Sequence, residues 1–346
     1  MMSRCLRLPR PSRGCAALFS AAALALSAHA AAAETAVKFA LDWKFEGPSA
    51  PYFVAIDNGY YADAGLDVTI DSGPGSVKGI TRIAAGTYPI GFMDINSLAK
   101  FLDQNPGSPV TAVLMVYNRP PFAIVSTTER GVLKPKDLEG RILGAPAPDG
   151  AYAQWKAFVK ENGIDASKVQ IENVGFPVRE PMLARGEVDA ITGYSFSSHF
   201  NLIRNGIAPE DVKVMMMADY GLQLYGNAIM VNTDYAKANP DVIKGFVAAT
   251  IKGVQAAVAD PETAIKSVMK RNEIADESLE LARLKMAIRD NIVTDEVRKN
   301  GFGGVDAARL ATSLDQIGVT YEFTNRPEPS AVFDSSYLPP AADRQL

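Results

Sequence analysis

Aromatic side chains gather at positions where strands are expected to end, and such side chains can stack on a flat solute. The candidates are Trp43, Phe45, Tyr117, Tyr152, Phe176, Tyr194, Phe196, Tyr220 and Tyr225. The cations in the same loops are Lys44, Arg119 and Arg179. Aromatic faces bury flat or apolar bodies, whereas a small anion needs dense cationic or N–H donors. The residue types therefore predict a site for an aromatic or heteroaromatic solute, which can carry a carboxylate.

Polar and small residues at the same strand ends complete the set of candidate ligand-binding residues. In the first half of the chain these are Asp42, Trp43, Lys44, Ser72, Gly73, Ser76, Asp94 and Asn96. Further along the chain they are Tyr117, Arg119, Tyr152, Phe176, Tyr194 and Tyr225. The loop at 72–76 either offers N–H groups to a polar atom or is a plain turn with a capping serine. Likewise, Arg119 either clamps a carboxylate or caps a surface turn, and Trp43 either stacks on the solute or packs in the core.

Residues with catalytic or metal-binding chemistry are sparse. The histidines are His29 and His199, and the cysteines are Cys5 and Cys15. Residues 73–79 match neither a Walker A loop nor the G-x-G-x-x-G fingerprint, and the chain has no G-x-S-x-G elbow. We therefore expect a protein that is not an enzyme, with no catalytic residue, no metal site and no cofactor.

Residues 1–33 have the features of a secretory signal peptide. Four arginines precede the apolar run 14–28, and the small residues at 28–30 and 31–33 fit a cleavage site. That run is shorter than the ~20 residues that span a bilayer. Cleavage would remove His29 and both cysteines, and it would take Lys+Arg from 35 to 31 against 39 acids, for a net charge of −8. We expect a periplasmic protein without membrane insertion of the mature chain, and one that does not bind nucleic acid.

Strands and helices alternate twice along the chain, which favours sheets covered by helices on both faces. The strands expected in the first series are 37–41, 66–70 and 90–93, and those in the second are 141–144, 169–174, 188–192 and 212–217. Two connections would join the series. One runs from residues 110–117 into 122–125, and the other returns near 222–231. A mostly helical region covers 241–317, and we expect the tail after 325 to form an extended strap that frays at its end. The pattern predicts two α/β lobes joined by a two-strand hinge, with lobe I at 34–118 plus 226–346 and lobe II at 119–225. Solutes bind beyond the carboxyl ends of strands in such sheets.

Several segments resemble, in order and spacing, the periplasmic substrate-binding proteins of ABC importers. They are Leu41-Asp42-Trp43 with 50–55, then 59–68, 133–141 and 183–190. The resemblance is to the NMT1/THI5-like branch, which serves nitrate, sulfonate, taurine and pyrimidine precursors. It implies a type II periplasmic-binding-protein fold whose lobes close over a ligand, and it places Trp43 where planar ligands stack. It also implies an ABC permease with its cytoplasmic ATPase as partner, and we expect a monomer.

One stretch departs from the pattern of the pyrimidine-linked members, L-D-W-x-P-N-x-x-H-x-G. Here Phe45 and Glu46 replace Pro-Asn, Ser49 stands where the histidine would be, and Pro51 replaces the glycine. Enzymes of this fold that make the pyrimidine use that histidine and a cysteine-rich motif, and the mature chain would have neither. We therefore expect a planar ligand other than a pyrimidine precursor. The alternatives are an alkylsulfonate or taurine-like anion, a pyrimidine-synthesising enzyme, and a sensor in place of the importer.

Overall fold

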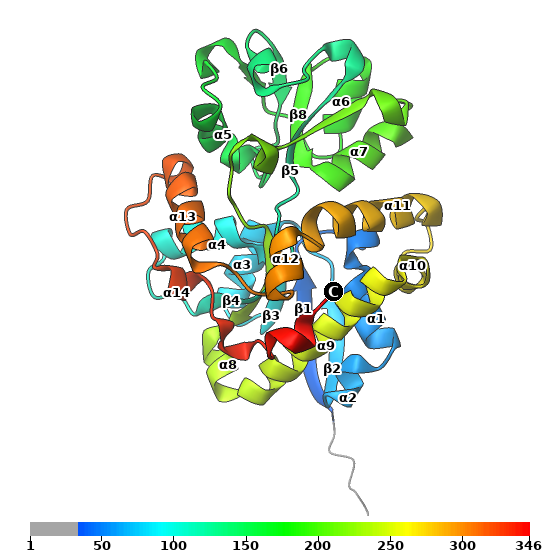
Figure 1. Cartoon of the computed structure of the whole chain (residues 1–346), viewed down its shortest axis with the longest axis vertical. Coiled ribbons are helices and arrows are strands. Elements are labelled where there is room, and N and C mark those ends of the chain that lie inside the picture. The colour runs from blue at the N-terminus through cyan, green and yellow to red at the C-terminus, as the bar shows by residue number, and fades with distance from the viewer. Residues whose placement is uncertain (1–33) are drawn as a thin grey trace, which may run out of the picture. The chain divides into compact units, whose positions relative to one another are not determined.

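Two five-stranded sheets with helices on their faces build the part of the chain that the computed structural model describes, residues 34–346 (Figure 1). The predicted signal peptide lies outside these residues. The strand order is β2-β1-β3-β10-β4 in the first sheet and β7-β6-β8-β5-β9 in the second. We call the first sheet with its helices lobe I and the second lobe II. The type II periplasmic-binding-protein fold predicted from the sequence is confirmed.

Lobe I contains the first series of elements. Its strands are β1 (Thr35–Leu41), β2 (Leu66–Asp71), β3 (Ile90–Asp94), β4 (Val110–Met115) and β10 (Asn227–Asn232). Its first helices are α1 (Ala50–Asp57), α2 (Tyr60–Asp63), α3 (Ser76–Ala84) and α4 (Ile95–Gln104). The inner strands β3 and β10 are buried along their whole length, whereas the edge strand β2 begins by alternating buried and exposed residues. These patterns follow from burial on both faces in the sheet centre and partial exposure at its edge.

Lobe II repeats this arrangement. Its strands are β5 (Phe122–Thr127), β6 (Ile142–Gly144), β7 (Gln170–Glu172), β8 (Ala190–Tyr194) and β9 (Val212–Met216), and its helices are α5 (Trp155–Glu161), α6 (Arg179–Arg185) and α7 (Ser195–Arg204). In each sheet the strand that enters from the other lobe is antiparallel to its neighbours: β5 against β8 and β9, and β10 against β3 and β4. The sheets are therefore mixed, because a chain that crosses over enters each sheet in the reverse direction.

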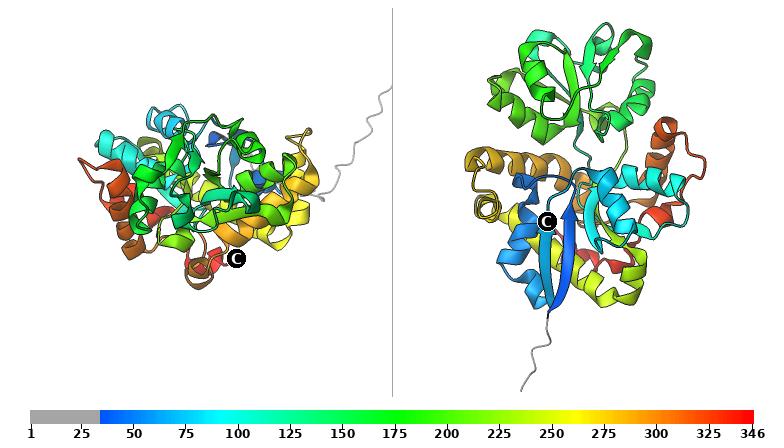
Figure 2. Two further views of the ribbon diagram at one scale, coloured as in Figure 1. Left: turned by 90° about the horizontal axis from the view of Figure 1, so that it is seen from above. Right: turned by 180° about the vertical axis from the view of Figure 1, so that it is seen from behind.

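The chain crosses between the lobes twice, after β4 and before β10 (Figure 2). The crossings are joined by the Gly226 amide, which donates to the Tyr117 carbonyl at 2.9 Å. A Cβ at Gly226 would lie 2.9 Å from the Tyr117 Cβ and 3.0 Å from the Pro120 Cα, so this close approach requires glycine. We propose that the lobe boundaries fall in these crossings, at 118/119 and 225/226.

The C-terminal region is helical, as predicted, and it packs mainly on lobe I. Its helices are α8 (Thr233–Ala238), α9 (Pro240–Ala259), α10 (Pro261–Met269), α11 (Glu277–Ala287), α12 (Asp295–Asn300), α13 (Ala307–Tyr321) and α14 (Pro329–Val332). Helix α9 is long and apolar enough to cross a membrane by length and composition, but one face is buried in the lobe I core. There the Phe246 ring meets those of Phe39 and Tyr61, with centroids 5.1 and 5.0 Å away.

The tail after Asn325 is anchored along its length, so the prediction that its end frays was wrong. The Phe333 segment bridges to β4, and the Asp334 amide donates to the Ala112 carbonyl at 2.8 Å. Near the C-terminus, the guanidinium of Arg344 is buried and donates to the carbonyls of Phe302 and Pro339. These bonds satisfy an arginine that would otherwise be costly to bury.

Candidate ligand-binding site

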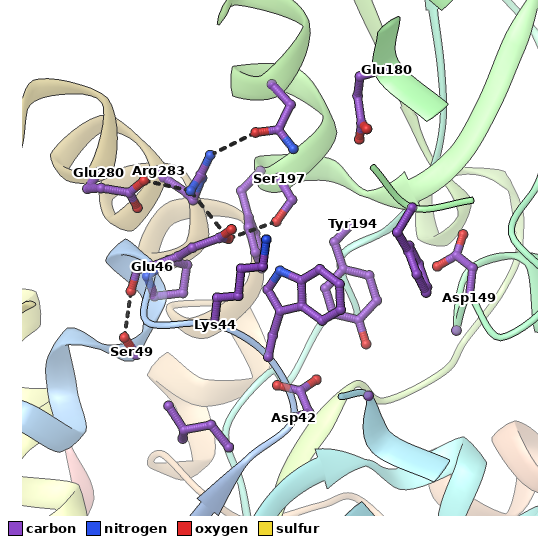
Figure 3. A pocket seen from close by; sticks show the side chains of 18 of the residues that line it. Asp42, Lys44, Glu46, Ser49, Asp149, Glu180, Tyr194, Ser197, Glu280 and Arg283 are labelled. Carbon is purple, nitrogen blue, oxygen red and sulfur yellow. Dashed lines mark hydrogen bonds and ion pairs between the residues drawn. The ribbon is translucent and has the colours of Figure 1, made fainter. Parts of the chain in front are cut away.

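A cavity of about 1080 Å³ lies between the two lobes (Figure 3). Asp42 follows β1, Asp94 ends β3 and Tyr194 ends β8, so the cavity lies at the carboxyl ends of strands from both sheets. This is where α/β sheets place their ligands, because loops and helix N-termini converge there. The volume is slightly above the usual range for small-molecule sites, which is roughly 300–1,000 Å³.

Aromatic rings from both lobes face each other across this cavity. The indole of Trp43 from lobe I meets the ring of Phe176 from lobe II edge to face, with centroids 5.4 Å apart. The Trp43 side chain is partly exposed in the cavity, in contrast to a core tryptophan, and the Lys44 ammonium lies 5.8 Å from its ring centroid. Tyr194 and Phe196, both from lobe II, form a second pair with centroids 6.0 Å apart. A flat solute could therefore contact rings of both lobes at once.

Asp42 is the centre of a hydrogen-bond network on the cavity floor. Its Oδ2 accepts from Asn227 Nδ2 at 2.7 Å and from the Ser76 hydroxyl at 3.4 Å. The Oδ1 of Asn227 in turn accepts from the Tyr194 hydroxyl at 3.2 Å, which links the floor in lobe I to lobe II. Burial raises the pKa of Asp42 to about 7 despite the Asn227 hydrogen bond. Asp42 therefore titrates in the neutral range, above the acidic range of an exposed aspartate.

Asp94 lines the cavity beside Asp42 and also caps helix α4. Its oxygens accept from the Asn96 and Ser97 amides at 3.3 and 2.8 Å, and from the side chains of the same residues at 2.8 and 2.7 Å. Burial nevertheless raises the pKa of Asp94. The Asn96 amide group is used by Asp94 and by the Tyr225 carbonyl, at 2.8 Å. Asn96 therefore positions Asp94 and does not itself line the cavity.

A buried arginine cluster forms the lobe II wall. The Arg179 guanidinium contacts Glu180 Oε1 at 2.6 Å and lies 3.7 Å from Asp149 Oδ2. Asp149 also accepts from the Thr192 hydroxyl at 2.6 Å, and Glu180 from the Ser198 hydroxyl at 3.0 Å. Burial raises the pKa of Asp149 although Arg179 opposes the shift. Arg179 is thus shared by two carboxylates.

A second buried arginine, Arg283 of α11, closes the other end of the cavity and was not found from the sequence. Its guanidinium lies 2.7 Å from Glu280 Oε1, 3.3 Å from Glu46 Oε2 and 3.2 Å from Asn201 Oδ1 of α7 (Figure 3). The Ser197 hydroxyl donates to Glu46 at 3.3 Å. Since Asn201 and Ser197 belong to lobe II, this network joins the lobes. It escaped prediction because α11 is more than 200 residues from Glu46 in sequence.

The structure brings most of the predicted residues to the cavity but not all of them. The predicted residues that line it are Asp42, Trp43, Lys44, Ser76, Asp94, Tyr117, Phe176 and Tyr194. Those absent from its wall are Ser72, Gly73, Asn96, Arg119, Tyr152 and Tyr225. Tyr52 of α1 and Arg283 line it without having been predicted, because helix residues carry no strand-end signal.

The predicted residues outside the wall have structural roles instead. Ser72 is exposed, and Gly73 packs so closely on the end of β1 that a Cβ would lie 2.0 Å from the Leu41 carbonyl oxygen. Arg119 forms an ion pair with Asp219 away from the cavity wall, as the surface-turn alternative implied. Tyr152 packs against a core cluster that includes Trp155 and Phe158 of α5. Tyr225 is buried beneath the Arg309 guanidinium, 4.0 Å from its ring centroid.

Curated relatives of this chain include both binding proteins and synthases. A formylaminopyrimidine-binding protein of Halalkalibacterium halodurans is 26% identical over 281 residues, which is 78% of this chain and 81% of that protein. A riboflavin-binding protein of Chloroflexus aurantiacus is 26% identical over 219 residues, 62% of this chain and 60% of that protein. A 4-amino-5-hydroxymethyl-2-methylpyrimidine phosphate synthase of Saccharomyces cerevisiae is 23% identical over 317 residues, 86% of this chain and 90% of the enzyme.

Solved structures match the fold at low sequence identity. The aliphatic sulphonate binding protein of Escherichia coli superposes with a TM-score of 0.69 at 13% identity, covering 88% of this chain and 99% of that one. The profile of the NMT1/THI5 like family matches residues 47–264. The chain therefore belongs to the NMT1/THI5-like family and has the fold of the solute-binding proteins of ABC import systems.

Proposed function

We propose that this chain is a periplasmic solute-binding protein that captures a planar heteroaromatic solute between its lobes and delivers it to an ABC permease with its cytoplasmic ATPase. The observation that supports this most strongly is the pair of facing rings, Trp43 from lobe I and Phe176 from lobe II, inside one cavity. A ligand held by both lobes favours their closure, and closure gives the permease a signal that the site is loaded. The relatives that bind formylaminopyrimidine and riboflavin support a flat ligand.

The sequence allowed a ligand that carries a carboxylate, but the cavity offers few cations to bind such a group. Arg119, the predicted clamp, pairs with Asp219 away from the cavity wall. The buried cations Arg179 and Arg283 each already contact two carboxylates. Of the other two cations in the wall, Lys44 lies 5.8 Å from the Trp43 ring centroid and Arg204 acts on Asp276, so fewer free donors line the cavity than a sulfonate or taurine-like anion would need. This alternative is weaker than a planar neutral or cationic ligand.

The enzyme alternative rests on the relationship to pyrimidine phosphate synthases. At the position of the histidine in the pyrimidine-linked motif, the Ser49 hydroxyl donates to the Glu46 carbonyl at 2.6 Å and supports the turn before α1. His199 lies on α7 and is not part of the cavity wall. We therefore favour binding without chemistry.

A ligand screen with matched tryptophan variants tests the proposal. A ligand should raise the melting temperature by mass action, and among pyrimidines, flavins and other planar compounds at least one should do so. Trp43→Ala should weaken binding of that compound by roughly 1–3 kcal/mol, while Trp43→Phe, which keeps a ring, should lose less. Ligand-induced fluorescence change should disappear in Trp43→Phe, whose remaining Trp155 is 7% exposed and lies in a core cluster.

The proposal is contradicted if no planar compound shifts the melting temperature. It is equally contradicted if a compound binds with the same affinity to the wild type and to Trp43→Ala.

A further inference from the structure

The cavity wall has an excess of negative charge. In the described part of the chain, seven acidic and four basic residues line it. The pKa of Asp276 is lowered first by the hydrogen bond from the Ser278 hydroxyl and also by the charge of Arg204, so we count these two opposite charges together. The remaining acids therefore outnumber the remaining bases, and they are distributed over both lobes and α11.

The two buried arginines do not neutralise their surroundings. Arg179 lies between Asp149 and Glu180, and Arg283 lies between Glu46 and Glu280. When every carboxylate in them is ionised, each cluster has a net charge of −1. Burial raises the pKa of both Asp149 and Glu280, although Arg179 and Arg283 respectively oppose these shifts. Neither arginine is free to hold an anionic solute.

Asp42 and Asp94 supply the carboxylates on the floor of the cavity. Within residues 34–346, neither of them forms an ion pair with an arginine. The side-chain donors to Asp42, Asn227 and Ser76, both reach Oδ2, and the backbone amide of Asp42 also bonds its carboxylate, so within residues 34–346 no side chain donates to Oδ1. The carboxylate of Asp94 accepts hydrogen bonds from the first residues of α4, and its negative charge adds to that of Asp42. Trp43, the next residue along the chain, lines the same cavity with its ring. A ring that stacks on Trp43 and points N–H groups at Asp42 would satisfy both side chains.

We propose that the solute is a planar cation, such as an aromatic amidine or a protonated aminoheterocycle, whose N–H groups donate to Asp42. This inference rests on the proposed function and specifies the ligand class of the same site. Charge-assisted hydrogen bonds of this kind are shorter and stronger than neutral ones. The aromatic walls add cation–π attraction for the same charge.

A series of three similarly shaped probes of different charge tests the proposal: benzamidine, benzamide and benzoate. Each is titrated into the wild-type protein at pH 7.5 by calorimetry, at concentrations up to the millimolar range. Benzamidine should bind at least tenfold more tightly than benzamide, and benzoate should bind most weakly. Benzamide or benzoate binding as tightly as benzamidine, or no benzamidine binding, would overturn the inference.

An isosteric pair of variants locates the effect. Asp42→Asn should weaken benzamidine binding by about ten- to hundredfold while changing benzamide binding little. Asp67→Asn makes the same chemical change at an exposed position of β2 outside the cavity, and it should bind like the wild type. Equal losses in both variants would contradict the role of Asp42. If Asp42→Asn does not fold, the probe series on the wild type still decides the matter.

Failure of this inference can be distinguished from failure of the proposed function. If riboflavin or another uncharged planar compound binds and benzamidine does not, the binding function holds and the cation preference is wrong. If no planar compound of any charge binds, the proposed function itself is wrong.

Discussion

Replacement of Arg283 by methionine should be among the most destabilising single substitutions in this protein. Arg283 is 1% exposed, and its guanidinium lies 2.7 Å from Glu280 and 3.3 Å from Glu46. Methionine fills much of the volume but leaves Glu280, which is 4% exposed, without its cation. The Gly47 amide still donates to Glu280 at 2.6 Å, so one hydrogen bond remains.

The expected loss in the free energy of unfolding is about 3–5 kcal/mol, the usual cost of removing one partner from a buried ion pair. Urea unfolding followed by circular dichroism measures it. The double variant Glu280→Gln/Arg283→Met removes both charges and should recover part of the loss, because no unpaired carboxylate stays buried.

Arg289→Met is the matched control. Arg289 pairs with Asp290 at 2.6 Å, but its side chain is 71% exposed, so the change should cost no more than ~1 kcal/mol. The reasoning is refuted if Arg283→Met unfolds within 1 kcal/mol of the wild type, or if the double variant is less stable than Arg283→Met alone. Loss of the Asn201 contact should also weaken the link between the lobes.

Three further predictions follow from local geometry. The affinity for benzamidine should be about tenfold weaker at pH 6 than at pH 8, because Asp42 has a pKa of about 7 and must be ionised to bind a cation. Calorimetry at both pH values checks this, and the affinity of Asp42→Asn for benzamidine should not depend on pH. Asp57 has a pKa lowered to about 2, because hydrogen bonds led by that from Arg271 outweigh the effect of burial. Solvent screens this exposed carboxylate, so its contribution should be about 1 kcal/mol, present above pH 4 and lost as the pH falls through 2; urea unfolding of wild type and Asp57→Asn over this range should converge at the acid end. Gly226→Ala should lower the free energy of unfolding by about 1–3 kcal/mol in the same urea assay, because the new Cβ would lie 2.9 Å from the Cβ of Tyr117. Gly107→Ala is the control: open space surrounds Gly107, so this variant should show only the smaller cost of a positive φ.

The pH prediction depends on which groups face Asp42. The titratable and polar groups that influence it come from several elements: Asp94 of β3, Ser76 of α3, Asn227 of β10, Tyr52 of α1, Tyr117 after β4 and Tyr194 of β8. The three tyrosines have pKa values raised well above their ordinary value by burial, so they stay neutral between pH 6 and 8. If the pH dependence persists in Asp42→Asn, another carboxyl of the cavity wall with a raised pKa titrates: Asp94, Asp149 or Glu280.

The sequence by itself determined the fold class and much of the cavity floor. Alternation of apolar strands and amphipathic helices is a local property, and the residue that follows a strand lies at a sheet edge in any α/β arrangement. Asp42, Trp43 and Asp94 were identified in this way, and all three line the cavity. The crossings between the lobes were predictable for the same reason, since a strand that runs on into a second series must leave its sheet.

Only the tertiary structure decided which of several equivalent strand-end residues reach the cavity. Asn96 lies two residues beyond Asp94, yet its amide is used within the α4 cap, and Tyr225 is covered by Arg309 of α13. Arg283 and Glu280 come from α11, whose place at the cavity depends on packing between segments more than 200 residues apart. Neighbours of that kind arise from the packing of whole elements, and no local pattern in the sequence encodes them. The charge of the cavity, and with it the inferred charge of the solute, was therefore visible only in three dimensions.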